Sequence, residues 1–471
     1  MEQKITADYF RQKFEDSPDV AFNEITAGKN NSLRVTAAFI DGMVSSQLIN
    51  DYVLKPMFQE NSLGTANNQH ELLDLMMLGA VYHCQRKLCH TMSDCMTELL
   101  SGAAIIILDE PGAAVAFDVK GFDKRGISEP SNEGILKGSK EAFIEVMRTN
   151  TALVRRRIQS ENLAINITRV GTQSNTAISI VYLDGVANPQ TLAAVKEKLE
   201  SADLDGITTT GQLESFLLGR RNSIFPQLLY TERVDKFCAN ILEGRIGLLV
   251  DGLPMAYIMP VDFVAFFQAP EDYAHGHVVG SLIRIMRFIS AVIALLLPAV
   301  YVAITNFHHE MMPTQLAITT IGNARPIPFP TYMEVLLLLI AFEVLLETGL
   351  RLPQPIGQSA SIVGGLVVGQ AAIFAGLLSP GVIMIVATAA MCGFVMPSQD
   401  FSNTIRLFRI LLTVLALMGG LFTVTLGVIA ILYRMSLLEA FSMPYLSPFA
   451  ASDGKEMWSD TIVRAPYGGK K

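Results

Sequence analysis

The chain has 471 residues, half of them hydrophobic, and a formal net charge of −8 at pH 7. Its acidic balance argues against general nucleic-acid binding, which needs clustered Lys and Arg, and its mean hydropathy of +0.37 is high for a water-soluble protein. The five cysteines are typical of a reduced compartment, because a chain of this size does not need a disulfide framework.

The apolar residues are concentrated in residues 281–440, so we expect a soluble region followed by a membrane region. The N-terminal stretch MEQKITADYFRQKFEDSPDV has no apolar core, which is not typical of a secretory signal. We therefore expect residues 1–280 to stay in the cytoplasm.

The soluble region contains an internal repeat. Residues 35–57 resemble residues 178–200, an offset of 143, and residues 99–119 resemble residues 241–261, an offset of 142. Two matches in the same order and nearly the same register indicate a duplicated unit.

Each repeat is predicted to be an α/β subdomain. Short runs rich in Ile, Val and aromatic residues predict strands, and Asp-Gly pairs predict turns, because Gly accepts positive φ. The stretch EAFIEVMRTNTALVRRRI predicts an amphipathic helix that bridges the two subdomains. The predicted domains are 1–140 (first α/β subdomain), 141–280 (bridging helix and second α/β subdomain), 281–440 (helical transmembrane domain) and 441–471 (C-terminal tail).

Six residues in turns of the second repeat are candidates for turn and interface roles. Turn formation and capping account for the presence of an Asp beside a Gly, so no catalytic role is needed to explain it. The six residues are Asp184, Gly185, Glu243, Gly244, Asp251 and Gly252.

The soluble region lacks the common catalytic motifs: it has no glycine-rich phosphate loop, nucleophile elbow or HExxH. The stretch YHCQRKLCH holds four residues of metal-ligand type, but zinc ligands usually form two separated pairs, and a helix here would point Cys84 and Cys89 apart. Arginines 155–157 are interpreted as a solvated helix face in preference to a lipid or partner site. We predict no enzymatic activity, no cofactor and no metal site.

The membrane region contains four or five candidate spans of suitable length. Arg284 and Arg287 precede the first span and place its start in the cytoplasm by the positive-inside rule. Five spans would put the basic C-terminal tail on the opposite side, a conflict that a re-entrant segment within 359–397 would remove. The candidate spans are 287–306, 332–350, 359–378, 381–397 and 407–433.

The second span ends in a charged stripe, AFEVLLETGLR, with Glu343, Glu347 and Arg351 on one helix face. Each charge against lipid would cost roughly 2.5–3.5 kcal/mol, so this face is expected to turn toward protein or water. Glu347 can pair with Arg351, whereas Glu343 lacks a partner in its own helix.

Three interpretations of the stripe stay open: a polar pathway for ions, a buried structural network, and a helix lying flat at the membrane interface. On the first interpretation, residues of this stripe and of the Gly-rich segment after it are pore or gating candidates. These are Glu343, Glu347, Arg351, Gln358, Val363 and Gln370.

Several long motifs resemble the A-subunits of the GerA-type spore germination receptors of endospore-forming bacteria. In the soluble region the resemblance is carried by RTNTALVRRRI, YLDGVANP, FPQLLYTERVDKFCANILEGRIGLLVDGLP and FFQAPEDY. In the membrane region it is carried by AFEVLLETGLRLPQPIGQSASIVGGLVVGQAAIFAGLLSPG and MPYLSPFA. The chain departs from that family at Val234, where Pro is usual, and at Arg434, where His is common.

The resemblance implies a multi-pass protein of the spore inner membrane, with its N-terminal domain on the cytoplasmic (core) side. It implies membrane lipid, further copies of the chain, a transporter-like B-subunit and a lipoprotein C-subunit as partners, and no nucleic acid. It also implies that the chain forms an oligomeric cation channel opened by nutrients. The alternatives are a related spore membrane channel protein associated with dipicolinic-acid release, a secondary transporter, and a membrane-tethered enzyme.

Overall fold

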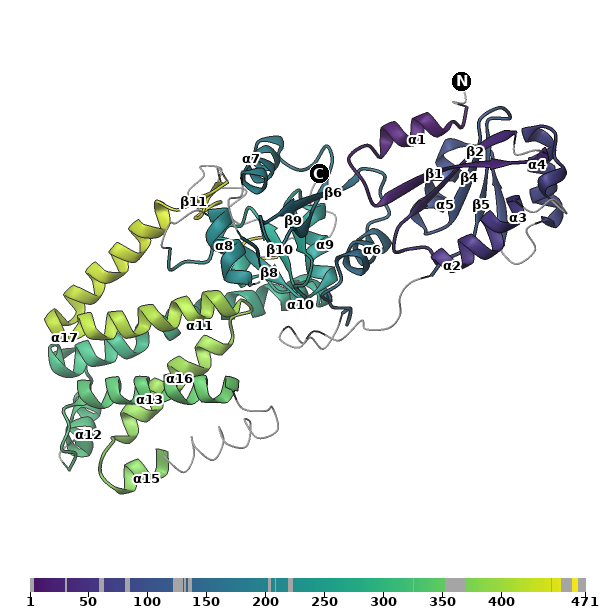
Figure 1. Ribbon diagram of the computed structural model, residues 1–471. Helices are drawn as coiled ribbons and strands as arrows, with labels where there is room; N and C mark the ends of the chain where they lie inside the picture. The colour runs from purple at the N-terminus through teal and green to yellow at the C-terminus, as the bar shows by residue number, and fades with distance from the viewer. Residues whose placement is uncertain are drawn as a thin grey trace. The chain divides into compact units, whose positions relative to one another are not determined.

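The computed structural model groups the chain into two compact units (Figure 1). Unit 1 comprises residues Met1–Arg221 and Leu228–Pro260, and unit 2 comprises Asn222–Gln227 and Val261–Lys471. The residues described are 4–29, 32–58, 63–80, 85–121, 130, 133, 138–201, 205–207, 209–218, 223–324, 326–351, 369–441, 443–449 and 460–464.

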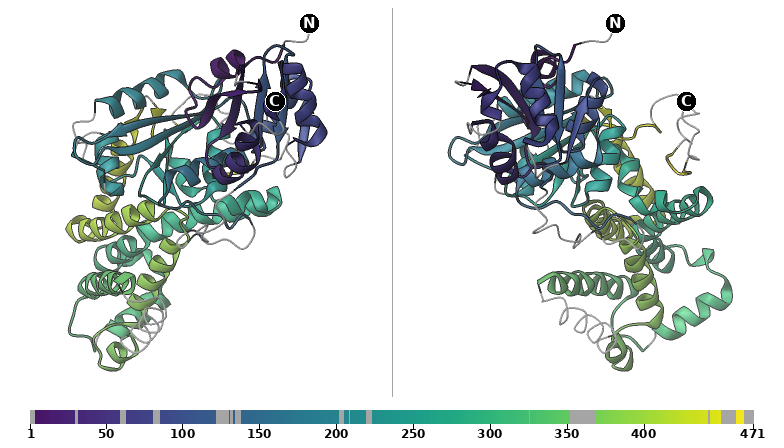
Figure 2. Two further views of the ribbon diagram at one scale, coloured as in Figure 1. Left: turned by 45° about the vertical axis from the view of Figure 1, so that its right-hand side comes forward. Right: turned by 90° about the vertical axis from the view of Figure 1, so that its right-hand side faces the viewer.

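The first repeat of unit 1 is a five-stranded antiparallel sheet with the strand order β1-β2-β4-β5-β3. Helices pack on both faces of this sheet (Figure 2). Its elements are α1 (Ala7–Lys13), β1 (Val20–Ala27), β2 (Leu33–Ile40), α2 (Ser46–Leu48), η2 (Ile49–Leu54), α3 (Lys55–Phe58), η3 (Leu63–Thr65), α4 (Gln69–Leu75), η4 (Met76–Ala80), β3 (Arg86–Cys89), α5 (Met92–Leu100), β4 (Ala104–Leu108) and β5 (Ala113–Phe117).

The second repeat has the same strand order, β6-β7-β9-β10-β8. The register is also the same: Thr36 pairs with Ile107 between β2 and β4, and the corresponding residues Ser179 and Leu249 pair between β7 and β9. Its elements are α6 (Met147–Arg157), β6 (Leu163–Val170), β7 (Thr176–Leu183), α7 (Pro189–Glu200), α8 (Thr210–Leu218), β8 (Leu229–Thr231), α9 (Val234–Leu242), β9 (Ile246–Val250) and β10 (Ala256–Met259).

The helix before the first strand also belongs to the repeat. The backbone N–H of Ala7 at the start of α1 donates to Asp109 Oδ1 (2.9 Å), and that of Met147 at the start of α6 donates to Asp251 Oδ1 (3.1 Å). Asp109 directly follows β4, and Asp251 directly follows the equivalent strand β9. The predicted bridging helix is therefore the first helix of the second repeat, and α1 is its counterpart.

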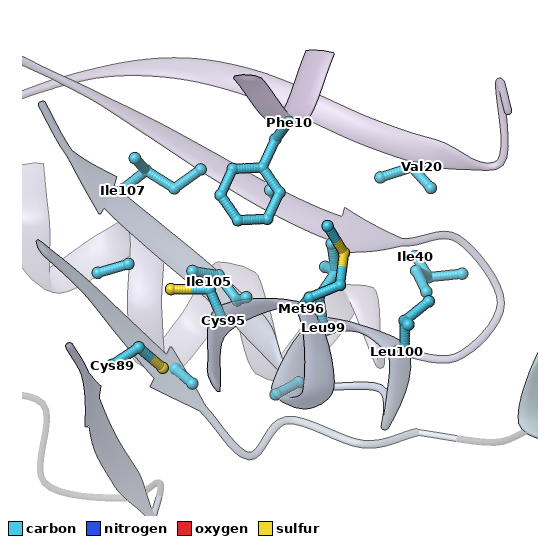
Figure 3. Packing of buried hydrophobic residues seen from close by; sticks show 14 of the residues in the cluster. Phe10, Val20, Ile40, Cys89, Cys95, Met96, Leu99, Leu100, Ile105 and Ile107 are labelled. Atoms are coloured by element: carbon cyan, nitrogen blue, oxygen red, sulfur yellow. The ribbon is translucent and has the colours of Figure 1, made fainter. Parts of the chain in front are cut away.

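The central strand β4 shows how sequence fixes the core. AIIIL is an unbroken apolar run, as expected of a strand buried on both faces. Ile105 and Ile107 pack against Phe10 of α1 and Leu99 of α5 (Figure 3), while Ile106 and Leu108 pack into the cluster on the opposite face.

The helix predicted around YHCQRKLCH is wrong for Arg86–Cys89, which forms the edge strand β3 paired with β5. Cys89 is buried in the core beside Cys95 of α5, on the face shown in Figure 3. His83 and Cys84 lie outside the described residues.

Arg155 corrects a second expectation, that arginines 155–157 form a solvated face. Its side chain is 0% exposed and its Nε and Nη2 donate to the Asp19 carboxylate at 2.7 and 3.0 Å. Its Nη1 donates to the Leu163 carbonyl at 2.7 Å. Arg156 and Arg157, in contrast, are part-exposed and pair with Glu141. Arg155 thus joins the two repeats through a buried ion pair.

Unit 2 is helical, with one two-stranded sheet near its C-terminus. Its elements are η5 (Phe263–Phe267), α10 (Pro270–Ala274), α11 (His277–Asn306), η6 (His309–Met311), α12 (Thr314–Ala324), α13 (Thr331–Arg351), α15 (Gly369–Phe374), α16 (Pro380–Phe394), α17 (Gln399–Ser436), β11 (Glu439–Ala440) and β12 (Met443–Pro444).

The helices of unit 2 run between two ends, and we call the end where α11 begins the base. Phe401 at the start of α17 contacts Phe267, which precedes α11, with 5.1 Å between ring centroids. The Ser402 hydroxyl donates to the carbonyl of Gly393, at the end of α16, at 3.0 Å. α17 therefore begins, and α16 ends, at the base.

The opposite end, where α11 ends, is called the far end. Glu334 at the start of α13 accepts a hydrogen bond from the Ser379 N–H at the start of α16 (2.6 Å). A Cβ on Gly381 would lie 3.4 Å from the hydroxyl of Tyr301, near the end of α11. α13 and α16 therefore both run from the far end to the base.

α17 is broken and turns back on itself at the far end (Figure 1). Gly419 and Gly420 have non-helical dihedrals, and Gly420 has φ of 61°. The Thr423 hydroxyl donates to the carbonyl of Leu415, eight residues earlier, and a Cβ on Gly420 would lie 2.9 Å from Phe307 Cβ. The chain then returns to the base, where the Phe263 N–H donates to the Tyr445 carbonyl (2.8 Å).

This reversal lies inside the predicted span 407–433. The re-entrant segment within 359–397 stays a prediction, because residues 359–368 lie outside the described residues. The apolar run 407–433 gave no sign of a break because two glycines are compatible with a packed helix. In the described part of the chain, α11 and α17 are the two helices that meet the length and composition of a membrane span.

Candidate functional site in the helical unit

The charged face of α13 meets the first half of α17. Glu343 accepts a hydrogen bond from Arg406 Nε at 2.9 Å and one from Arg409 Nη2 at 3.0 Å. Arg409 is 1% exposed, whereas the side chains of Glu343 and Arg406 are 23% and 22% exposed. Glu343, for which the sequence predicts no partner in its own helix, thus has two partners in another helix.

This group of three, which we call the Glu343 cluster, carries one carboxylate and two guanidinium groups. The Nε atom of Arg409 is buried and has no hydrogen-bond partner among the described residues. One turn further along α13, Glu347 is exposed. The helix therefore presents an ion-paired acid toward α17 and a second acid at the surface of the unit.

The remaining pore and gating candidates fall in different places. Arg351 is the last residue of α13. Gln370 is exposed on α15, and Gly376, two residues after that helix, lies near Pro326 at the far end. Gln358 and Val363 lie outside the described residues.

Glu334 is a further buried acid that the sequence analysis did not single out. It is 0% exposed, and its Oε2 binds the Ser379 N–H at the start of α16, where the positive end of the helix dipole favours a carboxylate. Its Oε1 is buried, and the part of the chain that the structure describes gives it no hydrogen-bond partner. Glu334 could have been found from the sequence, because it is a carboxylate within the apolar run TYMEVLLLLI.

A second buried charge cluster, the base cluster, is centred on Asp272. Its two carboxylate oxygens each lie 2.7 Å from Arg287 Nη1, and Arg284 Nε lies 3.3 Å from its Oδ2. Asp272 and Arg284 are both 0% exposed. Arg284 and Arg287, which suggested a cytoplasmic start for the first span, are thus neutralised in a buried network. They are therefore weaker evidence for the orientation of this span than free positive charges would be.

The C-terminal segment 460–464 completes the base cluster. Arg284 Nη1 donates to the Asp460 carbonyl at 2.9 Å, and the Tyr273 hydroxyl donates to Asp460 Oδ2 at 3.0 Å. The Arg464 N–H donates to the Ser281 hydroxyl at 3.0 Å. Part of the tail is therefore bound at the same end of unit 2 as the start of α11.

Aromatic rings fill the space beside the base cluster. Tyr445 lies 6.3 Å from Phe263 and 6.2 Å from Phe266 between ring centroids. Its hydroxyl is buried and has no hydrogen-bond partner within the residues that the structure describes. Burial raises the pKa of Tyr445 well above its usual value. The residue therefore acts as a neutral packing group.

The break in α17 depends on glycine. The φ of 61° and ψ of −139° at Gly420 lie in a region that is essentially restricted to Gly. We expect Gly420→Ala to destabilise unit 2 by about 1–3 kcal/mol, because the new methyl group adds a contact at 2.9 Å to the strained backbone.

The test of this prediction is the thermal aggregation temperature of the full chain in detergent. Gly393→Ala in α16 is the matched control, since a Cβ there meets nothing within 4 Å. Equal aggregation temperatures for the two variants would contradict the role of Gly420.

The six turn candidates of unit 1 separate into two groups. Gly244 packs against Val186, the residue after Gly185, because a Cβ on Gly244 would lie 2.9 Å from the Val186 carbonyl. Asp184, Gly185, Glu243 and Gly244 therefore lie at one end of the sheet. Asp251 and Gly252 lie at the other end, where they bind the start of α6: Asp251 accepts from the Met147 N–H, and the Gly252 N–H donates to the Glu145 carbonyl.

Groups of three or more His, Cys, Asp or Glu that could hold a metal ion are absent from the part of the chain that the structure describes. Asp272 and Glu343 of unit 2 are instead paired with arginines, and Glu334 accepts a hydrogen bond from a backbone N–H group. This arrangement can hold helices together and place charge within an apolar unit.

Comparisons with known proteins identify relatives over almost the whole length of the chain. The family profile "Bacillus/Clostridium GerA spore germination protein" matches residues 8–471. Spore germination protein KA of Bacillus subtilis (strain 168) is 34% identical over 96% of this chain and 82% of that protein. Spore germination protein B1 of the same organism is 31% identical over 98% and 94%.

Two further comparisons concern a membrane protein and a solved structure. The uncharacterized membrane protein YfkQ of Bacillus subtilis (strain 168) is 34% identical over 96% of this chain and 87% of that protein. The solved structure is titled "Crystal structure of the N-terminal domain of the A subunit of the Bacillus megaterium spore germinant receptor GerK3". The match to it has 27% sequence identity and a TM-score of 0.44, and it covers 56% of this chain and 98% of the GerK3 chain. From the profile match and the identities above 30%, this chain belongs to the GerA family of spore germination proteins.

Proposed function

We propose that this chain is the A-subunit of a nutrient germinant receptor in the spore inner membrane, and that copies of it form a cation channel that starts germination. The family assignment supports the germination role. A transporter-like B-subunit and a lipoprotein C-subunit are the proposed partners, and the chain itself is assigned no catalytic step.

The proposed membrane placement puts unit 2 in the bilayer as a polytopic domain, with unit 1 on the cytoplasmic side. Two observations support it: α11 and α17 have the length and composition of membrane spans, and one relative is named a membrane protein. The binding of residues 460–464 at the base supports a C-terminal tail on the same side as unit 1.

The observation that carries the channel proposal is the exposed Glu347 of α13. Two apolar residues earlier in the same helix, Ile340 and Val344, are 54% and 61% exposed, so apolar side chains close to Glu347 are uncovered in a single chain. A carboxylate against lipid costs roughly 2.5–3.5 kcal/mol, which assembly around a water-filled passage would remove. A ring of such acids attracts cations and repels anions.

Glu343 has a different role in this proposal. Its ion pairs with Arg406 and Arg409 hold α13 against α17, so that movement of one helix is transmitted to the other. Glu347 then faces the passage, and the Glu343 cluster fixes its position.

The test is potassium release from spores after nutrient addition. We expect Glu347→Gln to slow release about tenfold with the protein level unchanged, because a charged ring raises the local cation concentration by a factor of ten or more. Glu439→Gln, at an exposed acid of β11, is the control and should release potassium at the normal rate. Normal release from Glu347→Gln spores would refute the pore role of this side chain.

A further inference from the structure

A short stretch of the chain, residues 223–227, belongs to unit 2 although its neighbours in the sequence belong to unit 1. We call it the inserted segment, because it follows α8 and precedes β8, two elements of the second repeat. The chain enters unit 2 again after Pro260 and stays there. One crossing is enough to tether the two units, so tethering alone does not explain the earlier excursion.

The inserted segment is held on α17 close to the start of that helix. The Thr404 hydroxyl donates to the Ile224 carbonyl at 2.8 Å. The ring of Phe225, which is 5% exposed, stacks on the ring of Phe408 with 5.1 Å between centroids and lies 6.1 Å from that of Tyr445. A stacked ring pair and a hydrogen bond thus fix the segment to the first part of α17.

The connection from the inserted segment back to unit 1 is short and stiff. The Ser223 hydroxyl accepts from the Phe225 N–H at 3.2 Å and donates to the Phe225 carbonyl at 3.0 Å. Pro226 has a fixed φ, and Gln227 is 2% exposed. The first residue of β8, Leu229, follows Phe225 by four positions, a span of at most about 14 Å. A shift of β8 therefore reaches Phe225 with little slack.

Both connections to unit 2 leave from the same end of the strand pair β8 and β10. Leu229 at the start of β8 pairs with Ile258 near the end of β10, and Pro260 follows directly after β10. In the described part of the chain β8 is an edge strand of its sheet. An edge strand can shift with fewer broken hydrogen bonds than a central strand, so β8 is the strand of this sheet that moves most easily.

The opposite end of β8 is bound by Glu133, which lies between the two repeats in the sequence. The Glu133 carboxylate accepts from Lys236 Nζ at 2.7 Å and from the Glu232 N–H at 3.2 Å, and it also binds the Thr231 hydroxyl. Lys236 is 9% exposed, so this ion pair is largely shielded from water. A displacement of Glu133 would therefore act on β8.

The first part of α17 lies between the inserted segment and α13. Thr404 and Phe408 are one turn apart and share the face that meets the segment. Arg406 and Arg409, which bind Glu343 of α13, follow Thr404 by two and five positions, which places them on the other side of the helix. A movement of the segment can therefore pass through α17 to α13.

We propose that the inserted segment is the link through which unit 1 controls α17 and, through the Glu343 cluster, α13. A shift of β8 moves Phe225, the first part of α17 follows, and the ion pairs of Glu343 carry the movement to the helix that holds Glu347. The inference deepens the proposed channel by naming the element that gates it, and it rests on that proposed function.

The first experiment inserts two glycines between Gln227 and Leu228, which adds roughly 7 Å of slack and leaves the contacts of Phe225 in place. We expect potassium release from spores after nutrient addition to slow about tenfold, as for an allosteric coupling that is lost, with the protein level unchanged. In the control the same two glycines stand between Thr172 and Gln173, in an exposed turn of the same repeat, and release should be normal. Normal release from the first variant would overturn the proposal.

The second experiment does not require conduction and measures hydrogen exchange in the full chain purified in detergent. We expect Glu133→Gln, which removes the charge that binds Lys236, to speed exchange of the amides of residues 400–409 about fivefold. The same change combined with the insertion after Gln227 should leave this exchange as in the unchanged protein. No increase with Glu133→Gln, or an increase that the insertion does not remove, would overturn the proposal.

The two experiments separate this link from the channel itself. Exchange that responds as expected in a protein that conducts no potassium would refute the channel and leave the link standing. Potassium release that Glu347→Gln slows and the insertion does not slow would refute the link alone.

Discussion

Replacing Arg155 with methionine is expected to lower the free energy of unfolding of unit 1 by about 3–5 kcal/mol. The change leaves the Asp19 carboxylate, in a side chain that is 5% exposed, without its guanidinium partner. It also removes the hydrogen bond to the Leu163 carbonyl. An unpaired buried charge is among the largest single destabilising effects known in proteins, so the junction between the repeats should open first.

Pulse proteolysis of the full chain in increasing urea measures this loss. Arg156→Met is the matched control, because Arg156 pairs with Glu141 at a site where both side chains are about one third exposed; its loss should stay below about 1 kcal/mol. The double variant Asp19→Leu/Arg155→Met should recover part of the stability, because no unpaired charge is left. A single variant Arg155→Met as stable as Arg156→Met would show that the pair does not hold the repeats together.

Replacing Asp272 with alanine is expected to destabilise unit 2 by a similar amount, about 3–5 kcal/mol. Arg284 and Arg287, which are 0% and 5% exposed, would lose the carboxylate between them. Arg284 keeps its contacts to Asp460, so Asp460→Asn should have a smaller effect than Asp272→Ala.

The yield of monodisperse full-length chain extracted from membranes reports this effect. Glu310→Gln serves as the control, because its side chain is 75% exposed, and its yield should match that of the unchanged protein. A normal yield for Asp272→Ala would mean that the base cluster contributes little to the stability of unit 2.

The repeat in unit 1 could be read from the sequence because strands and their following turns recur at a constant offset. The sequence predicted the helix that became α6 as a bridge, but not that α1 and α6 are equivalent, since these two helices differ in length and sequence. What they share is a cap from an aspartate about 100 residues later, with separations of 102 and 104. A contact between residues so far apart in the sequence cannot be predicted from local periodicity.

The buried charges show the same limit. Arg155 looked solvated among three arginines because its partner Asp19 is 136 residues away. The stripe on α13 offered Glu343 no partner in its own helix, and the two arginines that pair with it follow 63 and 66 residues later. The arginines before the first span were read as free charges, whereas Asp272 and Asp460 neutralise them.

The break in α17 could not be predicted from hydropathy. Residues 407–433 have the composition of one long span, and two adjacent glycines are compatible with close helix packing. Their non-helical dihedrals follow from a tertiary contact, the approach of Gly420 to Phe307 and His308 at the end of α11.

The most direct test of conduction is potassium flux through vesicles that hold this chain with its B- and C-subunits. Nutrient should open a flux that rises in proportion to the potassium gradient and does not saturate. A flux that saturates, or no flux when the nutrient is bound, would contradict the channel.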